Sequence, residues 1–483
     1  MSTIASNELV RPGVPYRRLL ELAIGLLAVA AAAAAVSNEG LLLLALCLPL
    51  LILALLRFDF YICAVVFLLP VYPFIDWKLP VRDAFLLAHF VLFVGICVVQ
   101  VRNGVPWRGW LWQGWMRKGM IAFTAVAAGS LVLSESRDIE GAAKALAKLL
   151  SYTAVFLSVA AWAVTRERIV RIIKLLLIST IAVCVFGLYQ AIVGDFTSFY
   201  FQLYPDMEPV FMAGGGWVGR ITSFLFHYNS LAGYLNAIMP LALAVTVLGR
   251  KTGLRRLAFI CLCLSWAAVF FTGSRGGLVA LGAVLLSAMF YLRPRGRTTA
   301  VVLAAAFLAS SVMLSISMER PGIGLNDSHQ GADDLSFDTR LALWGAAGAL
   351  FLEHPVAGAG FGTYRFAMQQ YLPGVRDQLD AHNLYLQTLA ETGIIGFLVF
   401  FLTISVFFRG SFRLIKHADP LLRTIGFAVC AAIGATLVHG LVDYLFITSP
   451  QFGNLFWLLL GLGVAAREGE QRFATPALEE GVF

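Results

Sequence analysis

Charged residues are scarce in this sequence of 483 residues. Asp, Glu, Lys and Arg make up only 13% of it, whereas a typical soluble domain has about 25%. Hydrophobic residues account for 59%. This composition excludes an ordinary soluble protein and predicts a polytopic membrane protein. The net charge of +8 does not indicate a nucleic-acid partner, because basic residues in membrane proteins mainly set topology.

Several familiar motifs are also missing. The sequence has no GxSxG, no P-loop, no dinucleotide fingerprint and no DxD-like pair in a predicted cytoplasmic loop. These absences argue against a soluble enzyme that uses a nucleotide sugar. All seven cysteines fall inside apolar runs, so they are expected to be small core residues rather than disulfide partners or metal ligands. Neither a cofactor nor a bound metal is expected.

Apolar runs long enough to cross a bilayer are abundant. A crossing helix needs about 17 to 25 residues, and we expect about 12 to 14 transmembrane helices from the candidate runs. They occur near residues 19–36, 40–57, 59–75, 84–101, 119–135, 145–164, 169–191, 229–248, 256–272, 277–293, 298–316, 384–408, 424–446 and 452–466.

Basic segments alternate along the chain and predict its orientation. Segments such as "RPGVPYRR", "TRERIVR" and "GRKTGLRR" are expected in the cytoplasm, and "SNEG" and "SESRDIEG" outside. Both termini are then cytoplasmic, and the Trp-rich run 107–115 forms a cytoplasmic interfacial belt. Five regions result: N-terminal helices (1–191), an outer segment (192–228), core helices (229–316), a long outer loop (317–383), and C-terminal helices with a tail (384–483).

The long outer loop contains two recognisable patterns. "FDTRLALWGAAGALFLEHP" is amphipathic and predicts a helix that lies against the bundle, ending near His354 and Pro355. "PVAGAGFGTY" follows as a glycine-rich turn. A loop this long is usually functional or disordered.

Arginines on the outer side need a reason, because the cytoplasmic loops carry most of the basic charge. Arg220, Arg275 and Arg340 lie at apolar edges, where a guanidinium is costly unless it is paired. Arg275, within "GSRGG", could be a snorkelling or topology-setting residue. It could also bind an anion, because flanking glycines let a phosphate approach the backbone and the guanidinium matches phosphate oxygens.

His382 and Asn383 close the outer loop at the start of an apolar helix. Asp380 or Asn383 could simply cap that helix, or His382 could accept or hold a proton at the membrane surface. Glu391 would lie one or two turns further on. A metal role is weaker, because no His or carboxylate follows His382 at i+3 or i+4.

Other polar residues have open roles. His227 and Asn229, with Tyr228 between them, could line the same outer cavity. His439 and Asp443 are four residues apart within an apolar run, and we expect them to share a helix face as a structural pair.

Four segments occur in an order that resembles the O-antigen ligase family. They are "GRITSFLFHYNSLAGYLN", "TGSRGGLVAL", "TRLALWGAAGALFLEHPVAGAGFGTY" and "AHNLYLQTLAETGIIGF". The resemblance covers roughly residues 210 to 450 and extends to O-antigen polymerases and bacterial O-oligosaccharyltransferases. The preceding spans match only in hydropathy.

The resemblance implies a GT-C-type glycosyltransferase fold, all helical, in the bacterial inner membrane with its active site facing the periplasm. The donor would be an undecaprenyl-pyrophosphate-linked glycan, transferred to an acceptor hydroxyl without metal. The family's functional residues correspond to Arg275, Arg340 and His382 as catalytic residues, and Arg220 matches a further arginine. The expected substrate-binding set is completed by His227, Asn229, Asn383 and Tyr385.

Several functions remain open at this stage. An O-antigen ligase acting on lipid A–core in lipopolysaccharide biosynthesis is favoured, and a polymerase that extends a glycan from the same donor is the main alternative. A protein O-oligosaccharyltransferase is weakened by the lack of an added outer domain after the last span. A non-enzymatic transporter predicts ionisable residues along the membrane midplane, but here they cluster at the outer face.

Overall fold

The structure is a computed structural model. It describes residues 51–71, 84–105, 110–134, 139–193, 220–225, 227–292, 307–312, 337–373 and 379–473. The predicted spans near 19–36, most of 40–57 and most of 298–316 lie outside these residues. Most of the outer segment 192–228 also lies outside them.

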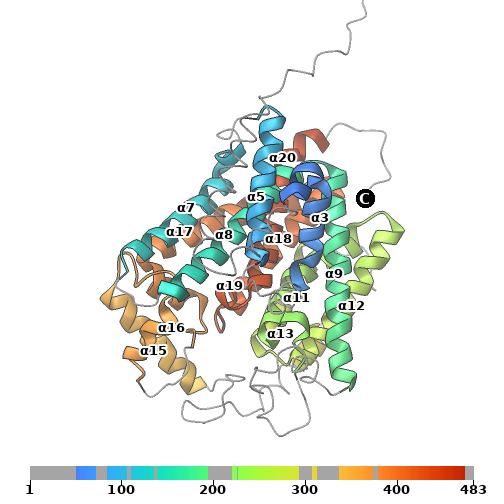
Figure 1. Ribbon diagram of the computed structural model, residues 1–483. Helices are drawn as coiled ribbons and strands as arrows, with labels where there is room; N and C mark the ends of the chain where they lie inside the picture. The colour runs from blue at the N-terminus through green and yellow to red at the C-terminus, as the bar shows by residue number, and fades with distance from the viewer. Residues whose placement is uncertain are drawn as a thin grey trace, which may run out of the picture.

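All regular secondary structure in the described ranges is helical, which confirms the predicted all-α class (Figure 1). The elements are α3 (Phe58–Leu68), η1 (Leu69–Val71), α5 (Ala84–Arg102), α7 (Gly114–Val132), α8 (Ile139–Trp162), α9 (Arg166–Val193), η2 (Ser223–Leu225), α11 (Tyr228–Leu248), α12 (Thr252–Thr272), α13 (Arg275–Tyr291), α15 (Phe337–Glu353), α16 (Tyr364–Ala367), η3 (Met368–Gln370), α17 (Leu384–Ile415), α18 (Pro420–His439), α19 (Leu445–Thr448) and α20 (Pro450–Phe473).

Six of these helices are long and apolar enough to cross a membrane: α8, α9, α11, α12, α17 and α18. Three shorter apolar helices cover Phe58–Val71, Ala88–Arg102 and Arg275–Tyr291. Several membrane-capable helices in one chain confirm the expected polytopic membrane protein. The expected total of about 12 to 14 spans and the division into five regions stay predictions.

Helix α11 lies at the centre of the bundle. It packs against α12, α13, α18 and α20, and its residues from Tyr228 to Val245 are all buried. A helix with apolar residues on every side belongs in a core, and "YNSLAGYLNAIMPLALAV" is predominantly apolar, with Asn229, Ser230 and Asn236 as its buried polar residues. The first turn of α11 and the ends of its neighbours therefore hold fixed positions.

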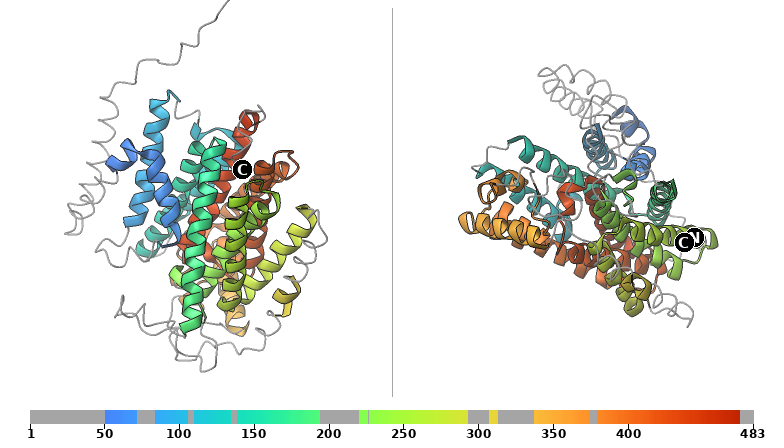
Figure 2. Two further views of the ribbon diagram at one scale, coloured as in Figure 1. Left: turned by 90° about the vertical axis from the view of Figure 1, so that its right-hand side faces the viewer. Right: turned by 90° about the horizontal axis from the view of Figure 1, so that it is seen from below.

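The amphipathic loop segment forms α15, as the sequence predicted. It lies along the side of the bundle beside α17 (Figure 2, right), and it ends at Glu353, just before His354 and Pro355. The glycine-rich turn follows, and Gly358, Gly360 and Gly362 all have positive φ. The outer loop is therefore built against the helices in this region.

Helix α17 is interrupted at Gly393, which has a φ of 62°. The interruption pairs with the turn after α15: Ala359 N donates to Ala390 O at 2.9 Å, and Ile394 N donates to Pro355 O at 2.9 Å. A Cβ at position 393 would overlap the backbone of Val356. Glycine allows both this close approach and the left-handed backbone.

The prediction that His439 and Asp443 share a helix face is wrong. α18 ends at His439, and Asp443 lies in the connection to α19. We call residues 440–444 the site turn. The helix ends there because Gly440 O accepts from Leu384 N at 2.7 Å, so this carbonyl bonds to α17 instead of continuing the helix.

Candidate functional site

The site turn is held by two segments that are distant in sequence. Three successive carbonyls of the turn accept hydrogen bonds from the starts of α17 and α15. Leu384 N donates to Gly440 O, Asn383 Nδ2 donates to Leu441 O at 3.0 Å, and Arg340 Nη1 donates to Val442 O at 3.0 Å. These bonds satisfy buried carbonyls and bring Arg340 and the His382 region to one place.

Asp443 lies at the centre of this arrangement and is 3% exposed. Its Oδ1 accepts from Tyr444 N at 2.8 Å and lies 3.4 Å from His382 Nδ1. Its Oδ2 lies 4.0 Å from His439 Nε2. The His382 contact is longer than a good hydrogen bond, and such contacts often tighten when substrate binds.

The neighbouring histidines lower the pKa of this buried carboxylate. Burial alone would raise the pKa of Asp443, because a low-dielectric environment disfavours charge. The contact with His382 and the charges of His382, His439 and His227 oppose that effect and hold the pKa of Asp443 below its ordinary value. Asp443 is thus a fixed negative charge in contact with His382.

His382 has an unusual backbone. Its φ is 46°, in the left-handed region that few residues other than glycine adopt. Both flanks are anchored: Gln387 Oε1 accepts from Ala381 N at 2.9 Å, and Asn383 caps α17 by accepting from Tyr385 N and Leu386 N. Strained conformations that are held this firmly concentrate at functional sites.

A hydrogen-bonded network that includes two carboxylates holds the residues around His382 in place. Arg365 on α16 pairs with Asp380 at 2.5 Å. Gln387 Nε2 donates to both Asp380 Oδ1 at 2.9 Å and Glu391 Oε1 at 3.0 Å. Burial would raise the pKa of Asp380, but the Arg365 guanidinium and Gln387 hold it below its ordinary value. Glu391 lies two turns beyond the start of α17 and bonds to Gln387, and Asn383 rather than Asp380 caps the helix.

The site turn also contacts this network. Tyr444 directly follows Asp443 and is 3% exposed. Its burial, together with the charges of Glu391 and Asp380, raises its pKa. The network therefore borders the site on the α16–α17 side.

Arg275 is the first residue of α13 and lies at the same end of the bundle. Ser274 caps this helix by accepting from Gly277 N, and its hydroxyl donates to Asn229 Oδ1 at 2.6 Å. A Cβ on Gly276 would lie 2.6 Å from Val442 and 2.8 Å from His439. Glycine at this position lets α13 approach the site turn closely. Arg275 precedes it in the chain, so the start of α13 at Arg275 also lies near the turn.

Arg220, His227 and Asn229 form the α11 side of the site. Arg220 lies over the ring of Tyr228 at 4.2 Å from its centroid, and the ring of His227 stacks on that of Tyr228 at 4.4 Å. His227 Nδ1 accepts from Asn229 N and caps α11. All three residues therefore lie where α11 begins, and His227 is close enough to Asp443 to contribute to the lowered pKa of its carboxyl.

Arg340 has a buried hydrogen-bond donor that no described residue satisfies. Its Nε is buried without a hydrogen-bond partner, and no carboxylate pairs with it among the residues that the structure describes. Its single bond to Val442 O uses one of five donors. An arginine in this state is costly to bury, and a phosphate group would supply the missing acceptors.

Two predicted substrate contacts have roles within the chain. Asn383 uses its oxygen for the α17 cap and its amide for Leu441 O. Tyr385 donates its hydroxyl to Leu437 O at 3.0 Å, and its ring stacks on Phe401. Substrate contact by either residue stays a prediction.

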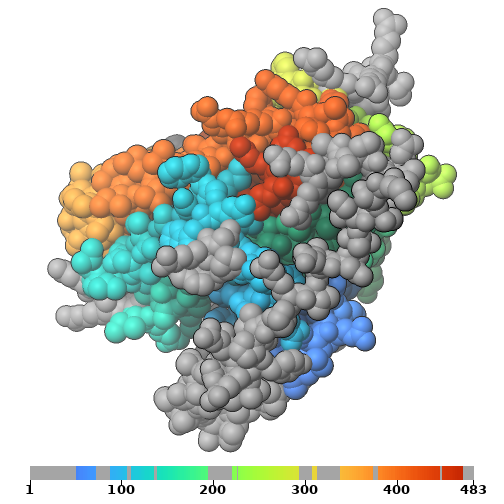
Figure 3. Space-filling model, turned by 90° about the horizontal axis from the view of Figure 1, so that it is seen from above, coloured from blue at the N-terminus to red at the C-terminus, as the bar shows by residue number. Residues whose placement is uncertain are grey.

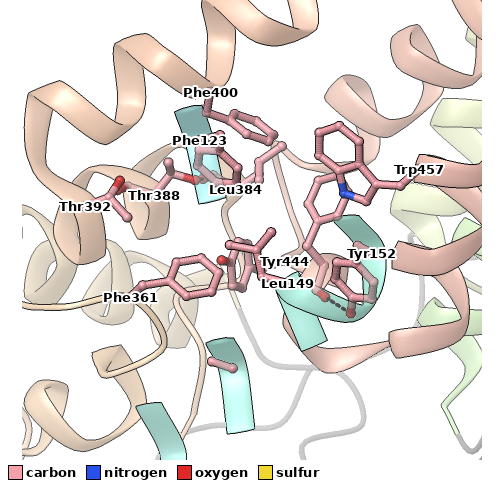
Figure 4. A pocket seen from close by; sticks show the side chains of 12 residues that line it. Phe123, Leu149, Tyr152, Phe361, Leu384, Thr388, Thr392, Phe400, Tyr444 and Trp457 are labelled. Atoms are coloured by element: carbon pink, nitrogen blue, oxygen red, sulfur yellow. Dashed lines mark hydrogen bonds between the residues drawn. The ribbon is translucent and has the colours of Figure 1, made fainter. Parts of the chain in front are cut away.

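An apolar cavity lies beside the site between α7, α8, α17 and α20 (Figure 4). Its volume is about 20 Å³, which is room for about one water molecule. Its lining is mostly aromatic and aliphatic and includes Phe123, Phe361, Phe400, Tyr444 and Trp457. A sugar does not fit in this space, so we do not place the glycan there.

Asp443, His439 and Gln387 are site residues that the sequence reasoning missed or assigned differently. The signal for the first two was present in "LVHGLVDYLF", where two ionisable residues flank a glycine inside an apolar run. Periodicity suggested a helical pair, but the glycine marks the helix end. No group of three or more His, Cys, Asp or Glu within the described part of the chain is arranged to hold a metal ion.

The fold and the site define the class. The chain is an all-α polytopic membrane protein with arginines and histidines gathered around a buried turn at one end of its helices. Residues 258–401 match the sequence model of the O-antigen ligase family. This match supports the resemblance seen in the sequence for that part of the chain.

The matched region contains Arg275, Arg340 and His382, but it ends before the site turn. A search of curated proteins finds no match to the chain. Asp443 and His439 are therefore assigned to the site on geometry alone.

Proposed function

We propose that this protein transfers a glycan from an undecaprenyl-pyrophosphate carrier to an acceptor hydroxyl, with Arg275, Arg340 and His382 as the catalytic residues. The observation that carries the proposal is that Arg340 and His382 contact the site turn and that Gly276, next to Arg275, packs closely against it. The proposal places the protein in the bacterial inner membrane with a GT-C-type fold and the site facing the periplasm. It needs no metal.

The arginines have the chemistry that a pyrophosphate requires. As the bond between the sugar's anomeric carbon and the phosphate oxygen breaks, the electron pair stays with the pyrophosphate and its negative charge grows. Guanidinium groups that bind it more tightly in the transition state lower the barrier. Arg340 has unused donors, Arg275 lies beside the same turn, and Arg220 is the third candidate contact.

His382 is suited to take the acceptor's proton. The acceptor oxygen forms the new bond to the anomeric carbon while its proton moves to the imidazole. Nδ1 faces Asp443, which leaves Nε2 for the hydroxyl. Asp443 stabilises the imidazolium that forms and fixes the ring, in the way that a carboxylate supports a general-base histidine. His227, Asn229, Asn383 and Tyr385 complete the proposed substrate-binding surface.

The test uses purified protein in liposomes with a lipid-linked glycan and an acceptor. We expect Arg275→Ala and His382→Ala each to lower the transfer rate about 100-fold or more. The control is Arg256→Gln, an exposed arginine on α12 away from the site. If either site variant stays folded and transfers at the wild-type rate, its proposed role is wrong.

We favour lipid A–core as the acceptor, which makes the protein an O-antigen ligase. A polymerase of the same donor is the alternative, because both reactions need the same leaving-group chemistry. The sizes of accumulated products separate them. Loss of a ligase leaves long lipid-linked polymer, whereas loss of a polymerase leaves single repeat units on the core.

A further inference from the structure

A second pocket, with several charged residues in its lining, lies at the opposite end of the bundle, between α7, α17 and α20. It encloses about 450 Å³, which is within the range of small-ligand sites. Its polar lining includes three arginines, Arg409 and Arg413 on α17 and Arg467 on α20. Figure 3 views this end, where the three helices lie side by side.

The pocket is remote from the site turn. Trp115 lines the pocket at the start of α7, and the end of α7 at Val132 lies about 25 Å further along the helix. Ser134, just beyond α7, bonds to Ala359 O in the outer loop. The basic segments predict that the pocket end faces the cytoplasm.

The arginines of the pocket carry unbalanced positive charge. Within the described ranges, Arg409, Arg413 and Arg467 have no ion pair or side-chain hydrogen bond. The pocket has one acidic lining residue, Glu468, and it already pairs with Arg117, whose Nη2 donates to Oε2 at 2.9 Å. Three guanidinium groups around one polar space repel each other unless an anion joins them.

The surroundings indicate which anion. Trp115 is 76% exposed at the rim, with Lys118 over its ring at 5.2 Å. Further along α17, Leu402 is 64% exposed and Phe408 is 41% exposed. An exposed tryptophan beside basic residues is typical of the membrane interface, and exposed apolar side chains on a membrane helix face acyl chains.

We propose that this pocket binds the phosphate of an anionic phospholipid headgroup, with the acyl chains lying against α17. The chemistry it recognises is a phosphate monoanion next to an apolar surface, and basic pockets between membrane helices have this property. The site is separate from the proposed transfer reaction, and its occupancy does not depend on that proposal.

The experiment measures lipid retention by the full-length protein. Delipidated protein in detergent is titrated with phosphatidylglycerol or with phosphatidylcholine of the same acyl chains, and bound lipid is counted by native mass spectrometry. We expect tighter retention of phosphatidylglycerol. Arg409→Gln/Arg413→Gln is expected to weaken it on the order of 30-fold, taking about fivefold for each basic residue.

The matched control is Lys251→Gln/Arg256→Gln, which removes two exposed basic residues from the start of α12 outside the pocket. We expect it to retain lipid as the wild type does. Equal retention of the two lipids, or an equal loss in the control, would overturn the proposal. Arg409 and Arg413 are exposed, so both variants should fold, and a melting curve without added lipid checks this.

A further experiment distinguishes a lipid headgroup from a soluble phosphate compound as the ligand of the pocket. Inorganic phosphate replaces the lipid, and melting temperature is measured. No stabilisation by phosphate, together with phosphatidylglycerol retention, supports the headgroup. Stabilisation by phosphate that disappears in the pocket variant, without lipid preference, contradicts the headgroup and assigns the pocket to a soluble phosphate compound.

Discussion

Replacing Asp443 by Asn tests the centre of the site with a change of almost no volume. At the 3.4 Å separation of His382 Nδ1 and Asp443 Oδ1, an imidazolium and a carboxylate attract each other by about 5 kcal/mol at an effective dielectric constant of about 20. Asp443→Asn removes this attraction when His382 takes the acceptor's proton.

The net effect is smaller than the full attraction. His382 is 14% exposed, so solvent screens part of this attraction. If about half remains, the barrier rises by about 2.4 kcal/mol, which is about 60-fold in kcat. KM should change less, because Asp443 stabilises charge that develops during the reaction.

The assay is glycan transfer in liposomes, with product resolved by gel mobility. Asp338→Asn is the control, because Asp338 is an exposed carboxylate in the first turn of α15. Asp443→Asn/His382→Ala should be no slower than His382→Ala alone, since the carboxylate acts through the imidazole. A folded Asp443→Asn variant with wild-type kcat, or two effects that multiply, would refute this reasoning.

Three further outcomes test the architecture. Gly276→Ala should lower the free energy of unfolding by about 1–3 kcal/mol, because a Cβ there would contact Val442 and His439 too closely. Gly434 has open space around it, so Gly434→Ala should leave the free energy of unfolding unchanged or raise it by up to about 1 kcal/mol. Denaturant titration measures both variants. Arg365→Gln leaves Asp380 buried without its charge partner. Thermal melting should show a free energy of unfolding that is lower by about 1–3 kcal/mol. This loss is smaller than for a fully buried ion pair, because Arg365 is partly exposed. The pKa of Asp443 is below its ordinary value. Its contribution to stability is therefore complete above about pH 4 and is lost as the pH falls through the pKa of the folded protein. In a pH series, the free energy of unfolding of Asp443→Asn should decline less steeply in acid than that of the wild type, and equal slopes would contradict this prediction.

Local patterns predicted the helices because they depend on neighbouring residues. The amphipathic stretch forms α15, which ends before Pro355, and the three glycines of the following turn have positive φ. The end of α18 was harder to predict. Gly440 interrupts an apolar run that is otherwise compatible with a longer helix, and its carbonyl bonds to Leu384, a partner that periodicity does not reveal.

The sequence by itself determined that this is a helical membrane protein and that one region resembles the O-antigen ligase family, because hydrophobic length and local motifs are properties of short segments. Only the tertiary structure decided which polar groups meet. Arg340 bonds to Val442 across 102 residues of chain, and Asp443 meets His382 and His439 only because α18 ends where it does. Contacts between distant segments depend on how the helices pack, and that packing placed a carboxylate at the centre of the site.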